Sequence, residues 1–453
     1  NVITKSKIHE HYNAPRQILP KTYYQTGNFE FFRINYKKKI KSISQKNIGY
    51  FKVIGPECID IDKKKDFKHT QKLINSYKFI VPKKLKIINK IFLKIFDINF
   101  FKNSFDIKKK IVNRKFSEND YKIIENELED LRSKSPTIFN IETTNYCNMK
   151  CVMCPRTIYM TRKNIWIDDD TFEKMLNKIK PYNKNEMENF WDWLEKEAKF
   201  DHSEVSENGF YFSVVSRCLI LHGYGEPFLD KYLIKRLKLC QEKNIPTYFS
   251  CTPATMTVEK AVHAMEAGLS VLKFSLDAMD DESIKSIRGK KANYGESVEK
   301  ILKLIDIKKE RGFKTLFVPC MISLNNDEES KKLQNNFLNF WKDKDVYAYV
   351  KSQDNRWLFE QNKDLVNASH YAKQYCEYPW TSLTVMADGN VVPCTQISNN
   401  EIILGNVNEN TLEEIWNGEK YKEFRKMHVT GKFPAKHKCN HSCDQVKLYE
   451  YIK

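Results

Sequence analysis

Three closely spaced cysteines are the strongest sign of chemistry in this sequence. Cys147, Cys151 and Cys154 form a C-x3-C-x2-C set directly after an apolar, β-branched run at 137–144. Three thiolates at this spacing can ligate three irons of a [4Fe-4S] cubane and leave the fourth iron free to bind another molecule. The spacing alone leaves two alternatives open, a zinc site or three unrelated buried thiols.

Residues 141–156, IETTNYCNMKCVMCPR, resemble the cysteine motif of the radical S-adenosylmethionine (SAM) superfamily. In that superfamily the amino and carboxylate groups of SAM chelate the free iron. The residue before the third cysteine is usually aromatic, and here it is Met153, a polarizable side chain that can pack beside an adenine. The resemblance implies that the three cysteines hold the SAM-binding cluster and that Met153 lies beside SAM.

Two later segments carry the same resemblance. LILHGYGEPFL at 219–229 is similar to the family's G-G-E-P motif, in which Gly225 would let the backbone approach the SAM amino group and Glu226 would accept from it. FSLDA and IRGK follow at 274–278 and 287–290. By the same resemblance Ser275 faces the SAM ribose and Arg288 the SAM carboxylate. Taken singly, Ser275 could cap a strand end and Arg288 could be a solvated helix residue.

A second cysteine set lies near the C-terminus. Two segments of alternating apolar and polar residues flank an Asp388–Gly389 turn. They predict a β-hairpin that positions Cys394. The layout resembles the SPASM and twitch extensions of radical SAM enzymes, and four cysteines imply the shorter, twitch type with one auxiliary [4Fe-4S] cluster. The implied ligands are Cys376, Cys394, Cys439 and Cys443.

Zinc remains an alternative at the second set, because four thiolates also complete a structural zinc site and two histidines lie nearby, His437 and His441. Residues 406–426 fit the helix that usually precedes the last cysteines. The remaining cysteines are interpreted as packing residues because they lie in or beside apolar segments, at positions 58, 218, 240, 251 and 320.

The segment from 134 to 360 alternates apolar strands with helical patterns, which is typical of βα units around a parallel sheet. It predicts an α/β fold with a partial (β/α)6 barrel, followed by a small cluster-binding domain at 366–453. Chemistry in such barrels lies at the carboxyl ends of the strands, where the first cysteines fall. The expected strands are 137–144, 217–223, 246–251, 270–276, 315–322 and 346–351.

An acidic, aromatic segment at 183–213 is longer than a usual connection in such a barrel. It could be a lid or docking helix that bears Phe190, Trp191 and Trp193. It could equally be an ordinary helix whose aromatic residues face the core.

Residues 1–78 resemble the C-terminal part of the cytidylyltransferases that activate acidic sugars as CMP-sugars, in the segments 14–34 and 55–74. The resemblance implies an N-terminal α/β fragment in which Asp60 and Asp62 hold magnesium, although the pair could instead cap a helix. The family's glycine-rich nucleotide motif is absent, so no cytidylyltransferase activity is expected from this chain alone. A chain that opens on Asn1 is expected to lack an upstream part.

Residues 79–133 predict a basic, helical linker. Apolar residues recur there at helical spacing between lysines, as in a helix that lies on an anionic membrane or packs against a neighbouring domain: Leu85, Ile88, Phe92 and Phe96. A second helix is expected at 117–135, before Pro136.

A formal charge of +18 suggests an anionic partner, but lysine is spread along the whole chain and therefore argues against nucleic-acid binding. Twelve cysteines without a secretory signal predict a cytoplasmic protein. No apolar run is long enough to span a membrane.

The resemblance implies reductive cleavage of SAM by an electron from a flavodoxin or ferredoxin, and hydrogen abstraction by a 5'-deoxyadenosyl radical. The N-terminal fragment favours a sugar or nucleotide-sugar substrate that is dehydrogenated, deoxygenated or epimerised for a surface glycan. A peptide-modifying enzyme and a non-enzymatic, cluster-bearing scaffold are the alternatives. No residue is assigned as the catalytic acid, base or radical quencher.

Overall fold

The computed structural model describes residues 2–3, 48–49, 100, 104, 107, 111, 117–196, 207, 210–211, 214–325, 327–352, 376–434 and 437–440. The chain forms two compact units, Asn1–Lys84 and Leu85–Lys453. In the first unit the described residues form one antiparallel pair, β1 (Val2–Ile3) with β2 (Ile48–Gly49). The predicted magnesium ligands Asp60 and Asp62, Cys58 and the apolar positions from Leu85 to Phe96 lie outside the described residues.

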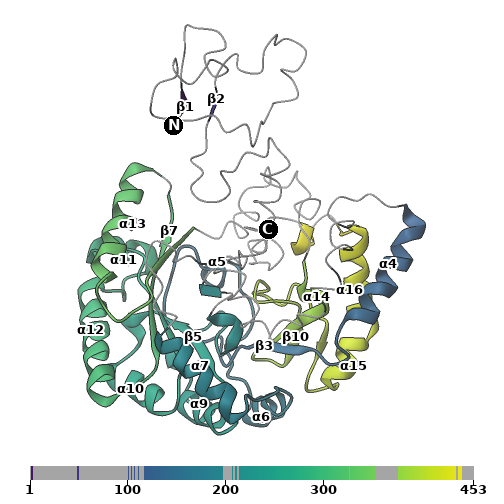
Figure 1. The fold of residues 1–453 in the computed structure, drawn as a ribbon, viewed down its shortest axis with the longest axis horizontal. Helices are drawn as coiled ribbons and strands as arrows, with labels where there is room; N and C mark the ends of the chain where they lie inside the picture. The colour runs from purple at the N-terminus through teal and green to yellow at the C-terminus, as the bar shows by residue number, and fades with distance from the viewer. Residues whose placement is uncertain are drawn as a thin grey trace, which may run out of the picture. The chain divides into compact units, whose positions relative to one another are not determined.

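The second unit is built on a nine-stranded sheet, in the order β11-β10-β9-β3-β4-β5-β6-β7-β8 (Figure 1). Strands β3 to β8 are parallel to one another and follow the order of the chain. This confirms the α/β partial barrel. Their bounds are Thr137–Ile141, Leu219–Ile220, Thr247–Cys251, Val271–Ser275, Leu316–Ser323 and Tyr349–Ser352.

All six predicted strands are present, and β4 is much shorter than predicted. The side-chain amide of Asn140 donates to the carbonyls of Ile220 and His222, at 3.2 and 2.6 Å. A side chain thus takes over acceptors that a longer backbone ladder would use.

Helices follow the parallel strands and cover one face of the sheet, hereafter the outer face. Buried side chains on that face include Phe249, Phe274 and Phe317, and Trp341 packs into the same core. The helices are α6 (Asp169–Leu176), α9 (Leu233–Glu242), α10 (Val258–Glu266), α11 (Asp281–Arg288), α12 (Tyr294–Arg311) and α13 (Glu328–Trp341). Several begin at a side-chain cap, as Asp168 caps α6.

The other, inner face of the strands carries a separate aromatic core, to which Phe139 and Tyr248 belong. Helix α7 (Lys184–Lys196) contributes the buried side chains of Phe190 and Trp193, and Trp191 is partly buried against the same core. For the described part of segment 183–213, the alternative with aromatic residues facing the core is therefore confirmed.

The C-terminal region extends the barrel sheet. Strand β9 (Ser382–Val385) pairs in parallel with β3, and β10 (Asn390–Val392) forms the predicted antiparallel hairpin with β9. Strand β11 (Gly405–Asn406) then pairs with β10. The sequence predicted the hairpin but not its pairing with the barrel.

The described part of this region also contains three α-helices and one 3-10 helix: α14 (Tyr378–Thr381), α15 (Leu412–Asn417), α16 (Glu419–Thr430) and η10 (Lys438–Asn440). Helix α4 (Glu118–Leu131) packs beside α16 through Ile124, Leu128 and Val429 (Figure 1). The expected helix at 117–135 is thus present and ends four residues early, since Arg132 already has an extended backbone before Pro136. The predicted helix at 406–426 is split between α15 and α16.

Four of the predicted packing cysteines are buried, which confirms that prediction for them: Cys218, Cys240, Cys251 and Cys320. No helix within the described ranges has both the length and the apolar content needed to cross a membrane.

Candidate functional site

The three cysteines of the first set lie in the loop between β3 and the short helix α5 (Pro155–Ile158). Cys151 is buried, Cys147 and Cys154 are partly exposed, and Cys154 is the N-cap residue of α5. Burial, together with the charges of Cys151 and Cys147, raises the pKa of Cys154 to about 11. The three thiols therefore lie within electrostatic reach of one another, and binding of iron by them would release protons.

The turn after β4 packs directly on this loop. The Glu226 N–H donates to the Tyr146 carbonyl at 2.7 Å, and a Cβ at Gly225 would collide with the Thr144 carbonyl. Only glycine therefore fits at position 225. The sequence predicted a close approach of this glycine to SAM, and the structure adds that the cysteine loop itself requires it.

The Glu226 carboxylate is buried, with only 3% of the residue exposed. It accepts from Thr252 N–H at 2.9 Å and from Phe228 N–H at 3.5 Å. Burial raises the pKa of Glu226 to about 7, against the effect of these two hydrogen bonds. A bound ammonium group would provide the positive charge that this carboxylate lacks.

Arg288, the last residue of α11, is buried rather than solvated, so the alternative of a solvated helix residue is wrong. Its guanidinium forms an ion pair with Asp277, and Nη1 lies 3.6 Å from Cys151 Sγ and 3.2 Å from Thr252 Oγ1. The Arg288 Nε is buried without a hydrogen-bond partner in the described part of the chain. The same helix end holds the loop, because Lys150 N–H donates to the Arg288 carbonyl at 3.2 Å.

Glu226 and Arg288 thus place an unneutralised carboxylate and an incompletely bonded guanidinium on two sides of Thr252, beside the cysteines. Such a pair fits the ammonium and carboxylate of an amino acid, which are the groups that SAM presents to a cluster. These residues therefore fit a SAM-binding [4Fe-4S] cluster held by Cys147, Cys151 and Cys154.

The two remaining residues predicted for SAM, Ser275 and Met153, lie on different faces of the sheet. Ser275 ends β6 with its Oγ 3.2 Å from Ser250 Oγ, and both side chains are partly exposed on the inner face. Met153 is partly buried against the outer core.

The second cysteine set is partly visible. Cys376 precedes α14, Cys394 follows β10 as predicted, and both pack against the inner-face core. Cys439 lies in η10, whereas Cys443 and His441 lie outside the described residues. The buried Tyr421 hydroxyl, which is within electrostatic range of Cys394, has no hydrogen-bond partner among the described residues. A donor of this kind suits the thiolate and sulfide acceptors of a cluster.

His437 limits how a zinc ion could bind at the second cysteine set. Its Nδ1 accepts from Cys439 N–H at 3.2 Å, so only Nε2 could coordinate a metal. Within the described ranges, no three side chains of His, Cys, Asp or Glu gather closely enough to hold a single metal ion, and this applies to Cys147, Cys151 and Cys154 of the first set as well.

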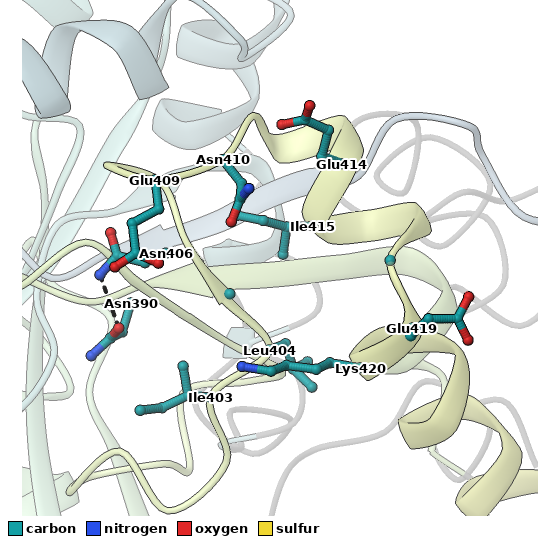
Figure 2. A pocket seen from close by; sticks show the side chains of 12 residues that line it. Asn390, Ile403, Leu404, Asn406, Glu409, Asn410, Glu414, Ile415, Glu419 and Lys420 are labelled. Atoms are coloured by element: carbon teal, nitrogen blue, oxygen red, sulfur yellow. Dashed lines mark hydrogen bonds between the residues drawn. The ribbon is translucent and has the colours of Figure 1, made fainter.

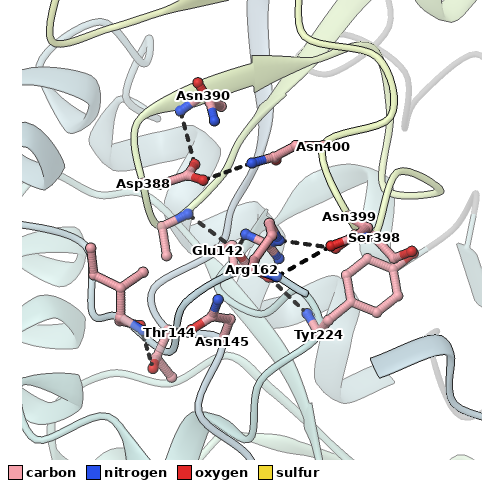
Figure 3. A network of polar contacts seen from close by, with 12 residues as sticks. Glu142, Thr144, Asn145, Arg162, Tyr224, Asp388, Asn390, Ser398, Asn399 and Asn400 are labelled. Atoms are coloured by element: carbon pink, nitrogen blue, oxygen red, sulfur yellow. Dashed lines mark hydrogen bonds and ion pairs between the residues drawn. The ribbon is translucent and has the colours of Figure 1, made fainter. Parts of the chain in front are cut away.

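A buried polar network joins the first cysteine loop to the auxiliary region (Figure 3). Glu142, fully buried after β3, accepts from both Nη atoms of Arg162 at 2.7 and 2.8 Å. It also accepts from the N–H groups of Tyr224 and Ala387, at 3.0 and 3.1 Å. Arg162 Nε donates to the Ser398 carbonyl at 2.9 Å. One carboxylate therefore connects the cysteine loop, the turn after β4 and the auxiliary hairpin.

Tyr224, the residue that replaces the first glycine of the motif, extends this network. Its hydroxyl donates to the Thr395 carbonyl at 2.8 Å, directly after Cys394. The departure from the family motif thus makes a contact with the auxiliary cysteine loop.

Sequence reasoning missed Glu142, Arg162 and the inward-facing Lys273 of β6. The available signal was a charged residue inside an apolar run: Glu142 stands in FNIETT and Lys273 in VLKFS. A charge in a buried strand needs a partner or a ligand.

A surface hollow of about 310 Å³ lies between β11, α15 and α16, lined in part by Asn406, Glu414 and Lys420 (Figure 2). None of the predicted site residues lines it.

Two family models match the chain. The radical SAM superfamily matches residues 215–334, and the SPASM iron-sulfur cluster-binding domain matches residues 376–444. The first match begins after the three cysteines of the β3 loop, and neither match reaches residues 1–78.

Two curated proteins are similar to the chain. An S-adenosyl-L-methionine-dependent 2-deoxy-scyllo-inosamine dehydrogenase from Niallia circulans is 28% identical over 119 residues, 24% of this chain and 46% of that protein. The chain thus spans less than half of that relative. A tungsten-containing aldehyde ferredoxin oxidoreductase cofactor-modifying protein from Pyrococcus furiosus is 22% identical over 349 residues, 68% of this chain and 88% of that protein.

Solved structures with some likeness include BtrN in complex with AdoMet and 2-DOIA, at 17% identity and a TM-score of 0.39, covering 68% of this chain and 92% of that one. Streptococcus suis SuiB bound to S-adenosylmethionine has 14% identity and a TM-score of 0.41, covering 72% and 78%. The family matches give this chain a radical SAM region and a SPASM region, the two regions of a radical SAM enzyme of the class that cleaves SAM reductively.

Proposed function

We propose that this enzyme oxidises a carbinol carbon of a sugar or nucleotide-sugar. The observation that carries the proposal is the placement of the two cysteine sets on one sheet. The first set follows β3, and Cys394 follows the hairpin that pairs with β3. Cys376 and Cys394 also pack against the inner-face core, where a substrate beside SAM would lie. A radical SAM dehydrogenation needs an acceptor for the second electron, and an auxiliary cluster on this face suits that role.

When bound, the cluster of the first cysteine set would supply the electron that cleaves SAM. The auxiliary cluster would accept the electron that the substrate gives up. In the proposed reaction the 5'-deoxyadenosyl radical takes the hydrogen atom from the carbinol carbon. The hydroxyl loses its proton and one electron leaves the substrate, so the alcohol becomes a ketone. The chain's own residues hold SAM: Glu226 for its ammonium, Arg288 for its carboxylate and Ser275 for its ribose.

The substrate class has two supports. The Niallia circulans relative is named a dehydrogenase of 2-deoxy-scyllo-inosamine. Residues 1–78 resemble cytidylyltransferases of acidic sugars, which favours a CMP-sugar or a related glycan precursor. Dehydrogenation is preferred over deoxygenation and epimerisation because it uses an electron acceptor. A single [4Fe-4S] cluster held by Cys376, Cys394, Cys439 and Cys443 is the proposed auxiliary centre.

The test is anaerobic incubation with SAM, reductant and a panel of CMP- and UDP-sugars deuterated at the carbinol carbons. The expected result is deuterium in 5'-deoxyadenosine and a product that has lost one deuterium and one hydrogen from the labelled sugar. In Cys151→Ala both signals should vanish, while Cys240→Ala, at a buried packing cysteine, should keep them. Formation of 5'-deoxyadenosine without any sugar product across the panel would contradict the proposal.

A further inference from the structure

We propose that the inner face of strands β4 to β6 binds an anionic group of the substrate, a carboxylate or a phosphate, with Lys273 as the cationic partner. This proposal rests on the proposed function, because it names the chemistry of the substrate that the same barrel would oxidise.

The inner face is closed toward the start of the strands and open toward their ends. Tyr248 is buried with 4% of its surface exposed, and Val271 is buried with 0% exposed. Two residues further along the same strands, Ser250 and Lys273 are partly exposed, and so is Ser275 after them. Residues two apart in a strand share a face, so these side chains border the same interior space. The open end is the end that carries the cysteine loop.

Lys273 is the inward-facing cation whose charge is not compensated. In the part of the chain that the structure describes, its ammonium has no hydrogen bond and no ion pair, and it lies 6.0 Å from the centroid of the Tyr349 ring. The neighbouring cations are already paired, Lys351 with Glu207 at 2.8 Å and Arg288 with Asp277. A partly buried ammonium without a counter-charge carries a desolvation cost that an anionic ligand would remove.

The groups beside Lys273 also offer donors. The backbone N–H of Ser250 points at His222 Nδ1 from 3.4 Å, so the ring proton resides on Nε2. Burial and the charge of Lys273 lower the pKa of His222 to about 3, so the imidazole stays neutral and can donate from Nε2. The Ser250 hydroxyl lies 3.2 Å from Ser275 Oγ, and it can donate outward when the Ser275 hydroxyl donates to it.

One uncompensated ammonium with neutral donors around it matches an acceptor-rich anion. A substrate with hydroxyl groups alone would leave the Lys273 charge unpaired. The other titratable groups packed near it do not alter this balance: Glu207 is engaged by Lys351, and the buried Tyr349 and Cys320 have raised pKa values and stay neutral. A carboxylate of an acidic sugar and a phosphate of a nucleotide-sugar share this chemistry.

Calorimetric titration of the reconstituted, SAM-loaded holoenzyme tests the proposal with two probes, glucuronate and inorganic phosphate, and with glucose as the neutral reference. Wild-type enzyme should bind at least one anion with one site per chain and should bind it more tightly than glucose. Lys273→Gln should weaken that binding about tenfold or more, since it removes a charge-assisted contact. Lys273→Arg should retain most of the binding because it keeps the charge. The matched control is Lys303→Gln, an exposed lysine on α12, which should bind as wild type does.

The better-bound probe identifies the source of the anion. Binding of neither anion to wild type, or equal binding by Lys273→Gln, would overturn the proposal. Iron content and circular dichroism of Lys273→Gln must match wild type, and Lys273→Arg provides the comparison if they do not. SAM cleavage without sugar is measured separately. Lysine-dependent anion binding without any sugar oxidation would refute the proposed function and leave the anion site standing.

Discussion

Of the buried arginine–carboxylate pairs that contact the cysteine loop, two differ in how fully they are bonded, Glu142–Arg162 and Arg288–Asp277. The Glu142–Arg162 pair is bidentate, and Glu142 accepts two further backbone N–H groups. The Arg288–Asp277 pair leaves Arg288 Nε without a partner among the described residues and lies beside Glu226, whose pKa is raised to about 7. The complete pair has nothing left to offer a ligand. The incomplete pair, with its neighbour, retains the donors and acceptors that an amino acid ligand would use.

The number of hydrogen bonds that each buried charge makes therefore distinguishes a structural contact from a binding site. A buried charge that is fully bonded stabilises one arrangement of the chain, and a buried charge that is only partly bonded costs free energy until a ligand arrives. The first pair should control folding and the second should control SAM affinity.

The largest effect is expected for Glu142→Gln. The substitution leaves Arg162 buried without its counter-charge, and the free energy of unfolding should fall by about 3 to 5 kcal/mol. Urea unfolding followed by tryptophan fluorescence measures it. The matched control is Glu266→Gln, which breaks an exposed pair with Arg311 of 2.6 Å and should cost no more than about 1 kcal/mol. Equal losses in the two variants would show that Glu142–Arg162 does not hold the auxiliary region to the barrel.

The second effect concerns the incomplete pair. Arg288→Gln should raise the dissociation constant of SAM about 10- to 100-fold, because a charge-assisted contact to a carboxylate is lost. Equilibrium binding of SAM to the reconstituted enzyme measures this, and Arg311→Gln on the exposed end of α12 is the control. Wild-type SAM affinity in Arg288→Gln, with a large loss of stability, would place Arg288 in the same structural class as Arg162.

The third effect is a pH dependence set by Glu226. Its folded pKa of about 7 lies above the ordinary value of 4.5, so ionising it costs folding free energy as the pH rises from 4.5 through 7. SAM needs the ionised form for its ammonium group. Below pH 7 its affinity should therefore fall, by up to about tenfold per pH unit, and above pH 7 it should level off. In Glu226→Gln the affinity should be lower and this dependence should disappear. An unchanged pH profile in that variant would assign the titration to another group.

The sequence predicted the incomplete site better than the complete one. Gly225, Glu226 and Arg288 stand in short motifs that carry the resemblance to the radical SAM superfamily, and that resemblance singled them out. Glu142 meets Arg162 across 20 residues, Tyr224 across 82 and Ala387 across 245, and no local pattern encodes such partners. The same limit explains why the parallel strands were predicted from apolar runs while the pairing of β9 with β3 was not. Register between distant strands is decided by packing rather than by local sequence.

The smallest effect is expected at Tyr224, where the complete network reaches the auxiliary cysteines. Tyr224→Phe removes the 2.8 Å hydrogen bond from its hydroxyl to the Thr395 carbonyl but keeps the backbone N–H that Glu142 accepts. The free energy of unfolding should fall by only about 0.5 to 1.5 kcal/mol. Because Thr395 follows Cys394, the reduction potential of the auxiliary cluster should shift while SAM affinity stays unchanged. Redox titration followed by electron paramagnetic resonance measures the potential, with Tyr294→Phe on α12 as the control. If SAM affinity changes and the reduction potential of the auxiliary cluster does not, Tyr224 acts on the SAM site. The turn after β4 would then belong to the SAM site and not to the structural network of Glu142 and Arg162.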